Sequence, residues 1–198
     1  MKAIDSANWF ARVGRASPTT NRSPKWLLSP QCGRRRCAIK GSAKDKKLDD
    51  IRRAFGPLIG TTLSAYSTAE LLHDDGNWGA WPDLPIRLEW GSRLTAVSWS
   101  KFDDLRIATD ASLPFAVDGP SVRWVRNGFP SLNRALGGAL LSAALGRGEM
   151  SIEGRDIEVW TRLLLQTDRG WLEIFNALDE NGYEYHPERP RGLLEPCV

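Results

Sequence analysis

The sequence is poor in the residues that build disulfide frameworks, metal centres and nucleophilic active sites. It has three cysteines, Cys32, Cys37 and Cys197, and two histidines, His73 and His186, among 198 residues. An odd number of cysteines is not typical of a small secreted disulfide-rich protein. Cys32 and Cys37 supply only two of the roughly four ligands that a structural zinc site needs. We therefore expect reduced thiols, no metal and no cofactor.

The motifs of several common enzyme and membrane-protein classes are also missing. The chain has no Gly-x-Ser-x-Gly elbow, no Walker loop and no dinucleotide fingerprint. Its longest apolar run, residues 135–146, is interrupted by glycine and is shorter than the about 20 residues of a membrane-spanning helix. No continuous apolar segment follows the first lysine, so a secretory signal is not expected. These absences favour a cytoplasmic protein with no membrane partner.

The net charge of +3 is the sum of two unlike segments. Residues 1–47 carry 12 Lys and Arg against 2 Asp and Glu, whereas residues 48–198 carry 15 against 22. The first segment is rich in serine and proline without sustained periodicity, which predicts a basic, disordered leader. Three interpretations of the leader remain open: no role, an organelle transit peptide, or a nucleic-acid or localisation patch around Arg34–Arg36. Nucleic-acid binding is expected only through the leader, because the remainder is acidic.

The hydrophobic pattern predicts an acidic, β-rich domain over residues 48–187 and an irregular, proline-rich tail over residues 188–198. Leu48, Ile51 and Phe55 share one face of a short helix. Residues 86–90 alternate as a strand, and the Gly91-Ser92 turn leads into a partner strand over residues 94–102. Further strands are expected at 121–125, 157–165, 171–175 and 183–185, and a second helix at 131–136. The fold class predicted is α+β and β-dominated, with antiparallel sheets forming a sandwich or open barrel and one or two short helices.

The two halves of this domain are similar to each other. Gly60 and Leu63 match Gly138 and Leu141, 78 residues later. The Arg-Leu pairs at 87–88 and 162–163 are 75 residues apart, and the acidic pairs at 103–104 and 179–180 are 76 apart. This pattern indicates an internal duplication, with two β-meanders packed about a pseudo-two-fold axis. Without a duplication, the same elements describe a generic antiparallel α+β domain.

The acidic pairs raise the possibility of a hydrolase. Carboxylates from both halves would lie together if the duplication is real: Asp103, Asp104, Asp179 and Glu180. Together with His73 or His186 they would provide acid and base groups for hydrolysis. The alternative is structural, because Asp, Asn and Gly are the ordinary residues of hairpin turns.

Tryptophan is abundant, and seven of the nine tryptophans lie in residues 48–198. Most occupy expected strand faces and are predicted to be core residues. Trp78 and Trp81 differ, because their glycine-rich segment has no strand or helix periodicity and is flanked by Asp74, Asp75 and Asp83. The segment is either a lid over the core or an exposed anchor for a partner. An aromatic anchor with an acidic rim suits a basic protein partner.

In its acidity, its aromatic content and its lack of catalytic motifs, the domain resembles the small β-rich immunity proteins that bacteria make against secreted toxins. The resemblance is one of overall character and includes no diagnostic motif. It implies a non-enzymatic domain that masks a basic toxin or nuclease, and the partner-binding surface is expected at the five residues of the tryptophan segment. The alternatives are the hydrolase and a carbohydrate- or ligand-binding module with an exposed aromatic platform.

Overall fold

The computed structural model describes residues 42–101, 103–110, 121–152, 155–178 and 180–198. The chain divides into two compact units, residues 1–39 and 40–198, and the first unit lies outside the described residues. The predicted disorder of the leader, its two cysteines and its arginine patch lie there too. The described residues form one α-helix, α1 (Ala43–Phe55), and two 3-10 turns, η1 (Gly56–Leu58) and η2 (Leu132–Ala135). The strands are β1 (Leu63–Leu72), β2 (Trp78–Ala80), β3 (Ile86–Trp90), β4 (Arg93–Ser100), β5 (Asp104–Ala108), β6 (Val122–Arg126), β7 (Leu140–Ile152), β8 (Arg155–Thr167), β9 (Gly170–Asn176), β10 (Asn181–His186) and β11 (Leu194–Pro196).

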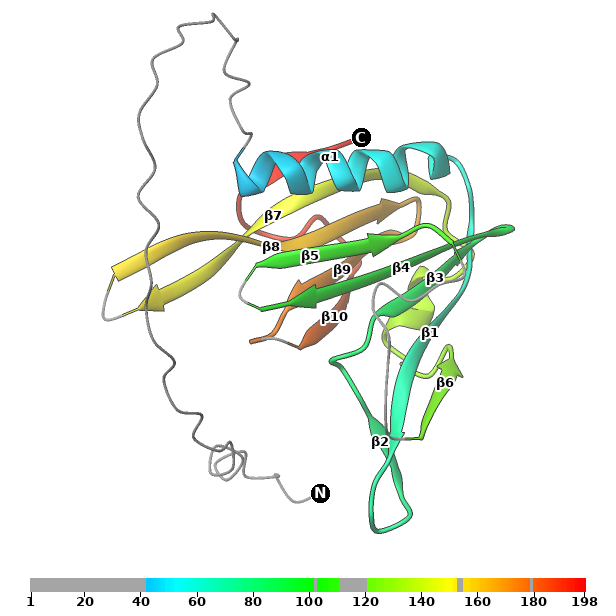
Figure 1. Ribbon diagram of the computed structural model, residues 1–198. Coiled ribbons are helices and arrows are strands. Elements are labelled where there is room, and N and C mark those ends of the chain that lie inside the picture. The colour runs from blue at the N-terminus through cyan, green and yellow to red at the C-terminus, as the bar shows by residue number, and fades with distance from the viewer. Residues whose placement is uncertain (1–41, 102, 111–120, 153–154, 179) are drawn as a thin grey trace, which may run out of the picture. The chain divides into compact units, whose positions relative to one another are not determined.

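These strands form two antiparallel sheets (Figure 1). The first sheet has the order β6-β1-β3-β4-β5, and β2 pairs with the last three residues of β1, beyond β3. The second sheet has the order β11-β7-β8-β9-β10. Each sheet is thus a four-stranded meander to which a later strand returns, pairing with the first strand of the meander. The predicted fold class, β-dominated with antiparallel sheets and short helices, is confirmed.

The second sheet repeats the first at a constant spacing of 77 residues. Equivalent strands begin at Leu63 and Leu140, at Arg93 and Gly170, and at Asp104 and Asn181. The irregularities coincide as well, because β1 has a register shift between Leu63 and Ala65 and β7 has one between Leu140 and Ser142. A β-bulge is a local feature of a particular fold. Its recurrence at one spacing shows that both sheets have the same architecture.

Backbone conformations and hydrogen bonds repeat at the same spacing. Gly60 and Gly137 have φ angles of 80° and 78°, which glycine adopts most readily. Gly60 N donates to Leu140 O and Gly137 N donates to Leu63 O, each at 2.8 Å. Between these bonds, Thr62 and its own equivalent Ala139 form an antiparallel bridge. Equivalent residues that pair with each other define a local two-fold axis, so the predicted duplication is confirmed.

The spacings expected from the sequence were wrong by one or two residues. At the observed spacing, Asp103 corresponds to Glu180 and Asp104 to Asn181. The error arose at Gly60, which was matched to Gly138. The conformational equivalent of Gly60 is Gly137, because this glycine has the positive φ angle.

Both repeats and α1 share one hydrophobic core. The buried cluster includes Trp99 from β4, Leu163 from β8 and Ile174 from β9. From α1 it includes Ile51 and Phe55, both fully buried. Burying such a side chain contributes about 1.5–3 kcal/mol. Although α1 precedes the first repeat, it packs over β7 of the second as well as β5 (Figure 1).

The helix begins earlier than the sequence predicted. It was expected from Leu48, but α1 starts at Ala43. Ser42 Oγ accepts the Asp45 N–H at 3.2 Å, and the Asp45 carboxylate accepts the Ser42 N–H at 2.8 Å. This capping box satisfies backbone donors at the helix end and lowers the pKa of Asp45. Residues 43–47, which were assigned to the leader, are therefore the first helical turn and part of the next.

The C-terminal segment is more ordered than predicted. Residues 188–198 were expected to be irregular, but Leu194–Pro196 form β11 on the edge of β7. Cys197 follows as a buried free thiol, and burial raises its pKa to about 11. The helix predicted at residues 131–136 is only the 3-10 turn η2. In the described part of the chain, no helix is long and apolar enough to cross a membrane.

Candidate functional site

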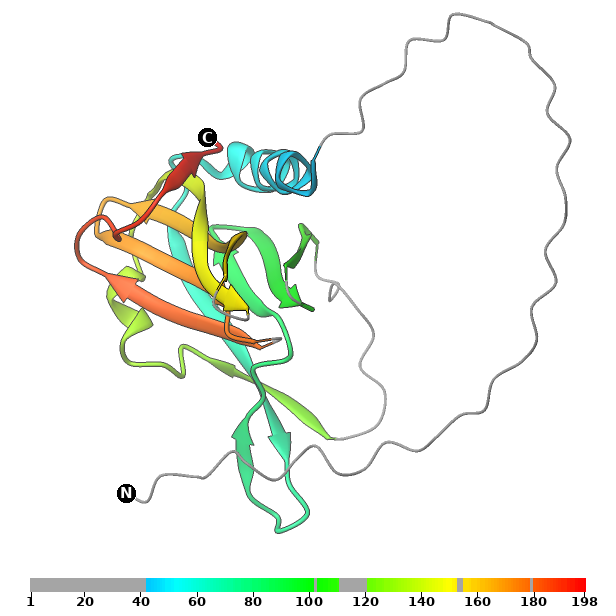
Figure 2. The ribbon, with the colours of Figure 1, turned by 90° about the vertical axis from the view of Figure 1, so that its left-hand side faces the viewer.

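β1 and β2 extend beyond the meander as a hairpin, called here the arm (residues 69–81). Figures 1 and 2 show the arm projecting from the first sheet at the end opposite α1. Within it, Trp78 pairs with Leu72, and Trp124 of β6 pairs with Ala69. The expectation that Trp78 lies outside any strand was therefore wrong. A strand of three residues is too short to show alternation, and its partner β1 determines it.

The two tryptophans of the predicted site are half-buried and held in fixed orientations. The Arg123 guanidinium lies 4.4 Å from the ring centroid of Trp78 and is paired with Glu70 at 2.6 Å. Trp81 Nε1 donates a hydrogen bond to the Asp83 carboxylate at 3.0 Å. Each ring therefore retains an accessible part, which a buried lid would not have.

The tip of the arm, residues 73–77, is exposed and acidic. The Asp75 carboxylate accepts hydrogen bonds from Asn77 N at 2.9 Å and Asn77 Nδ2 at 3.0 Å, and the backbone bond lowers the pKa of Asp75. Asp74 is exposed beside it. The His73 imidazole lies against Gly79, where a methyl group would clash with it. Asp74 and Asp75 at the tip, with exposed Asp83 beyond β2, therefore belong to the same segment as the tryptophans.

The acidic turns hold their carboxylates in other contacts. Asp103 accepts a hydrogen bond at 3.0 Å from Lys47 Nζ, a buried ammonium that also donates to Trp160 O at 2.9 Å. Asp104 is paired with Arg106 at 3.1 Å. Glu180 is exposed, and Asp179 lies outside the described residues. Among the residues that the structure describes, no hydrogen bond or ion pair joins these carboxylates to a histidine.

The tryptophans of the domain are all at least partly covered. Three are buried, Trp90, Trp99 and Trp160, and four are half-buried, Trp78, Trp81, Trp124 and Trp171. These seven rings therefore do not form the flat, open platform that the carbohydrate alternative requires.

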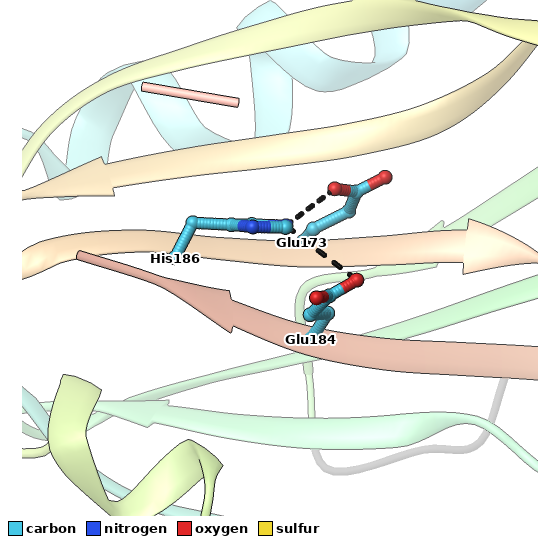
Figure 3. A group of neighbouring side chains, drawn as sticks. All are labelled: Glu173, Glu184 and His186. Atoms are coloured by element: carbon cyan, nitrogen blue, oxygen red, sulfur yellow. Dashed lines mark hydrogen bonds and ion pairs between the residues drawn. The ribbon is translucent and has the colours of Figure 1, made fainter. Parts of the chain in front are cut away.

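A second group of polar side chains lies on the outer face of the second sheet (Figure 3). Side chains alternate along a strand, so Leu163 and Ile174 face the core while Arg162 and Glu173 face outward. The Glu173 side chain is nevertheless only 5% exposed. Its two oxygens accept from Arg162 Nε at 2.5 Å and Arg162 Nη2 at 3.0 Å. The outer face therefore holds a buried carboxylate fixed by a bidentate guanidinium.

The same carboxylate contacts His186. His186 Nε2 lies 2.7 Å from Glu173 Oε2 and 3.8 Å from Glu184 Oε2. The Glu184 side chain is 60% exposed and the His186 side chain 22%. Their ligand atoms all lie within 4.8 Å of one another, and no other group of three potential metal ligands is found among the described residues.

A cavity of about 400 Å³ adjoins this group. It is lined by Ser142, Ala144, Gln166, Trp171, Arg189, Leu194 and Pro196. Trp171 pairs across strands with both His186 and Gln166, so the cavity and the charged group share one sheet face.

Sequence reasoning singled out His186 but missed Glu173, Glu184 and Arg162. The spacing of Glu184 and His186, two residues apart on an expected strand, places them on one face. The addition of Glu173 depends on the register between β9 and β10, which a single sequence does not specify. No family model matches the chain, and comparisons with curated proteins and with solved structures found no similar protein.

Proposed function

We propose that this chain is a non-enzymatic protein-binding domain and that its arm binds a basic segment of a partner protein. The observation that carries the proposal is the projecting arm itself, with two oriented, half-exposed tryptophans beside an acidic tip. Tryptophan is enriched among the residues that dominate binding energy at interfaces. Because Arg123 and Asp83 already orient the rings, binding would cost little side-chain entropy.

Charge identifies the kind of partner. The guanidinium over Trp78 is neutralised by Glu70, whereas Asp74 and Asp75 at the tip face solvent. The 22 acidic residues against 15 basic ones in residues 48–198 add a long-range negative field. Such a field accelerates association with a basic partner. An immunity-type role, in which the arm masks a basic toxin or nuclease, is the specific form that we propose.

We also propose that this function is carried out in a reducing compartment such as the cytoplasm. Cys197 is a free thiol in the folded unit. Free thiols are typical of proteins from reducing compartments.

The proposal is tested by selecting binders to the full chain from a random-peptide display library and measuring their affinities. We expect enrichment of peptides rich in Lys and Arg. Replacing both tryptophans, Trp78→Ala with Trp81→Ala, is expected to weaken the selected peptides about 30-fold or more. Asp74→Asn with Asp75→Asn is expected to slow association and to reduce its dependence on salt.

The matched control removes two acidic charges from elsewhere on the surface. Asp49→Asn with Glu188→Gln changes the net charge equally, at two exposed positions away from the arm. These variants are expected to bind almost as the unmodified chain does. Equal weakening by both charge variants, or peptides that bind the tryptophan variant unchanged, would show that the arm is not the binding surface.

A further inference from the structure

We propose that the outer face of the second sheet is a binding site for a divalent transition-metal ion, with Glu173, Glu184 and His186 as its ligands (Figure 3). The site is independent of the arm. The three side chains come from neighbouring strands, β9 and β10, and all point away from the hydrophobic core. The proposal rests on their geometry, on a comparison between the two repeats and on ligand chemistry.

The register places two like charges directly opposite each other. Glu173 and Glu184 are cross-strand partners. Acidic side chains in that arrangement repel each other and destabilise a sheet. Arg162 compensates the charge of Glu173, but the described structure shows no such cation on Glu184 apart from the His186 ring at 3.8 Å. A cation between the two carboxylates would remove the repulsion.

The fold itself does not require these charges, as the first repeat shows. The residue equivalent to Glu173 at the spacing of 77 is Ala96, and its cross-strand partner is Ala108. An Ala-Ala pair therefore occupies the position of the Glu-Glu pair in a sheet of the same topology. Glu173 is almost fully buried, and burying a carboxylate costs free energy unless it is paired. The second repeat thus carries a charged group that its architecture does not need.

The donor set indicates the class of metal. One imidazole nitrogen and two carboxylate oxygens suit zinc and related first-row ions, whereas calcium and magnesium prefer oxygen ligands alone. Glu173 Oε2 and His186 Nε2 are already 2.7 Å apart. Arg162 acts as a positioning residue, because its two hydrogen bonds hold the Glu173 carboxylate in one orientation. Three protein ligands would leave a further position on the metal for water or for a ligand.

The test is a zinc titration of the full chain after metal removal, in competition with a chromophoric chelator. Cys32→Ser with Cys37→Ser is the background, because thiolates are strong zinc ligands. We expect one zinc ion per chain. His186→Gln and Glu184→Gln should each weaken binding about tenfold or more. Cobalt should show visible absorption bands that are lost in the same variants.

His73→Gln is the matched control, because it removes the other histidine from an exposed position. It is expected to bind zinc normally. Glu184→Gln changes a largely exposed side chain, so its urea midpoint should equal that of the unmodified chain and a loss of zinc cannot come from misfolding. Zinc uptake that persists in both ligand variants, that disappears with the two cysteines, or that is replaced by tighter calcium binding would overturn the proposal.

Discussion

Asn181 shows how one buried side chain joins the two repeats. Its Oδ1 accepts the Trp99 N–H at 2.6 Å, and its Nδ2 donates to the carbonyls of Pro82 at 2.6 Å and Leu84 at 3.1 Å. Removing the amide would leave these backbone groups without partners in the protein interior. We predict that Asn181→Ala lowers the free energy of unfolding by about 2–4 kcal/mol. Urea denaturation followed by tryptophan fluorescence measures this, and the m value should not change.

The equivalent residue of the first repeat provides the control. Asp104 occupies the same position at the start of β5, but its side chain is 40% exposed and pairs with Arg106. Exposed ion pairs contribute little, so Asp104→Ala is expected to cost less than about 1 kcal/mol. A similar loss at both positions would mean that the hydrogen bonds of Asn181 do not account for its effect.

At the scale of elements, α1 depends on residues that the sequence assigned to the leader. Ser42 caps the helix, and the buried Lys47 joins it to Asp103 and Trp160. A helix cap contributes about 1 kcal/mol, and hydrogen bonds of a charged group about 1.5–3 kcal/mol. We predict that a chain beginning at Leu48 is about 2–4 kcal/mol less stable than one beginning at residue 40. Equal urea midpoints for the two chains would contradict this role of the first helical turns.

The sequence predicted some elements well and missed others for a physical reason. The β3–β4 hairpin followed from the alternation of residues 86–90 and the Gly91-Ser92 turn, both of which are local signals. Strands of three residues, such as those containing Trp78 and Leu194, are too short to alternate, and β1 and β7 determine them by pairing. The sequence likewise located the tryptophans of the candidate site. Their contact with Arg123, far along the chain, needed the fold.

At the scale of the whole molecule, the duplication is visible in backbone geometry more than in residue identity. Lys101 and Leu178, 77 residues apart, share positive φ angles of 52° and 62° although their side chains are unlike. Identity at this spacing persists at Gly60 and Gly137, where a turn requires a positive φ angle. A comparison of letters therefore found the duplication but not its spacing.

The shared core predicts how the two repeats behave when they are separated. Residues 42–128 and 129–198 each contain one repeat with its returning strand. However, Trp99 Nε1 donates to Ile174 O of the other repeat at 2.9 Å, and α1 packs on β7. Each fragment alone would expose apolar surface that the intact chain buries, at a cost of about 25 cal/mol per Å².

We therefore predict that neither fragment alone unfolds cooperatively in urea and that an equimolar mixture does. Near-ultraviolet circular dichroism follows the environment of Trp99, which is fully buried in the intact chain. Its signal should appear only on mixing, and Trp99→Ala in the first fragment should prevent it. The bonds around Thr62 and Ala139 would then re-form between separate chains. Cooperative unfolding of either fragment by itself would instead show that each repeat folds independently, with the common core a later contact between two complete units.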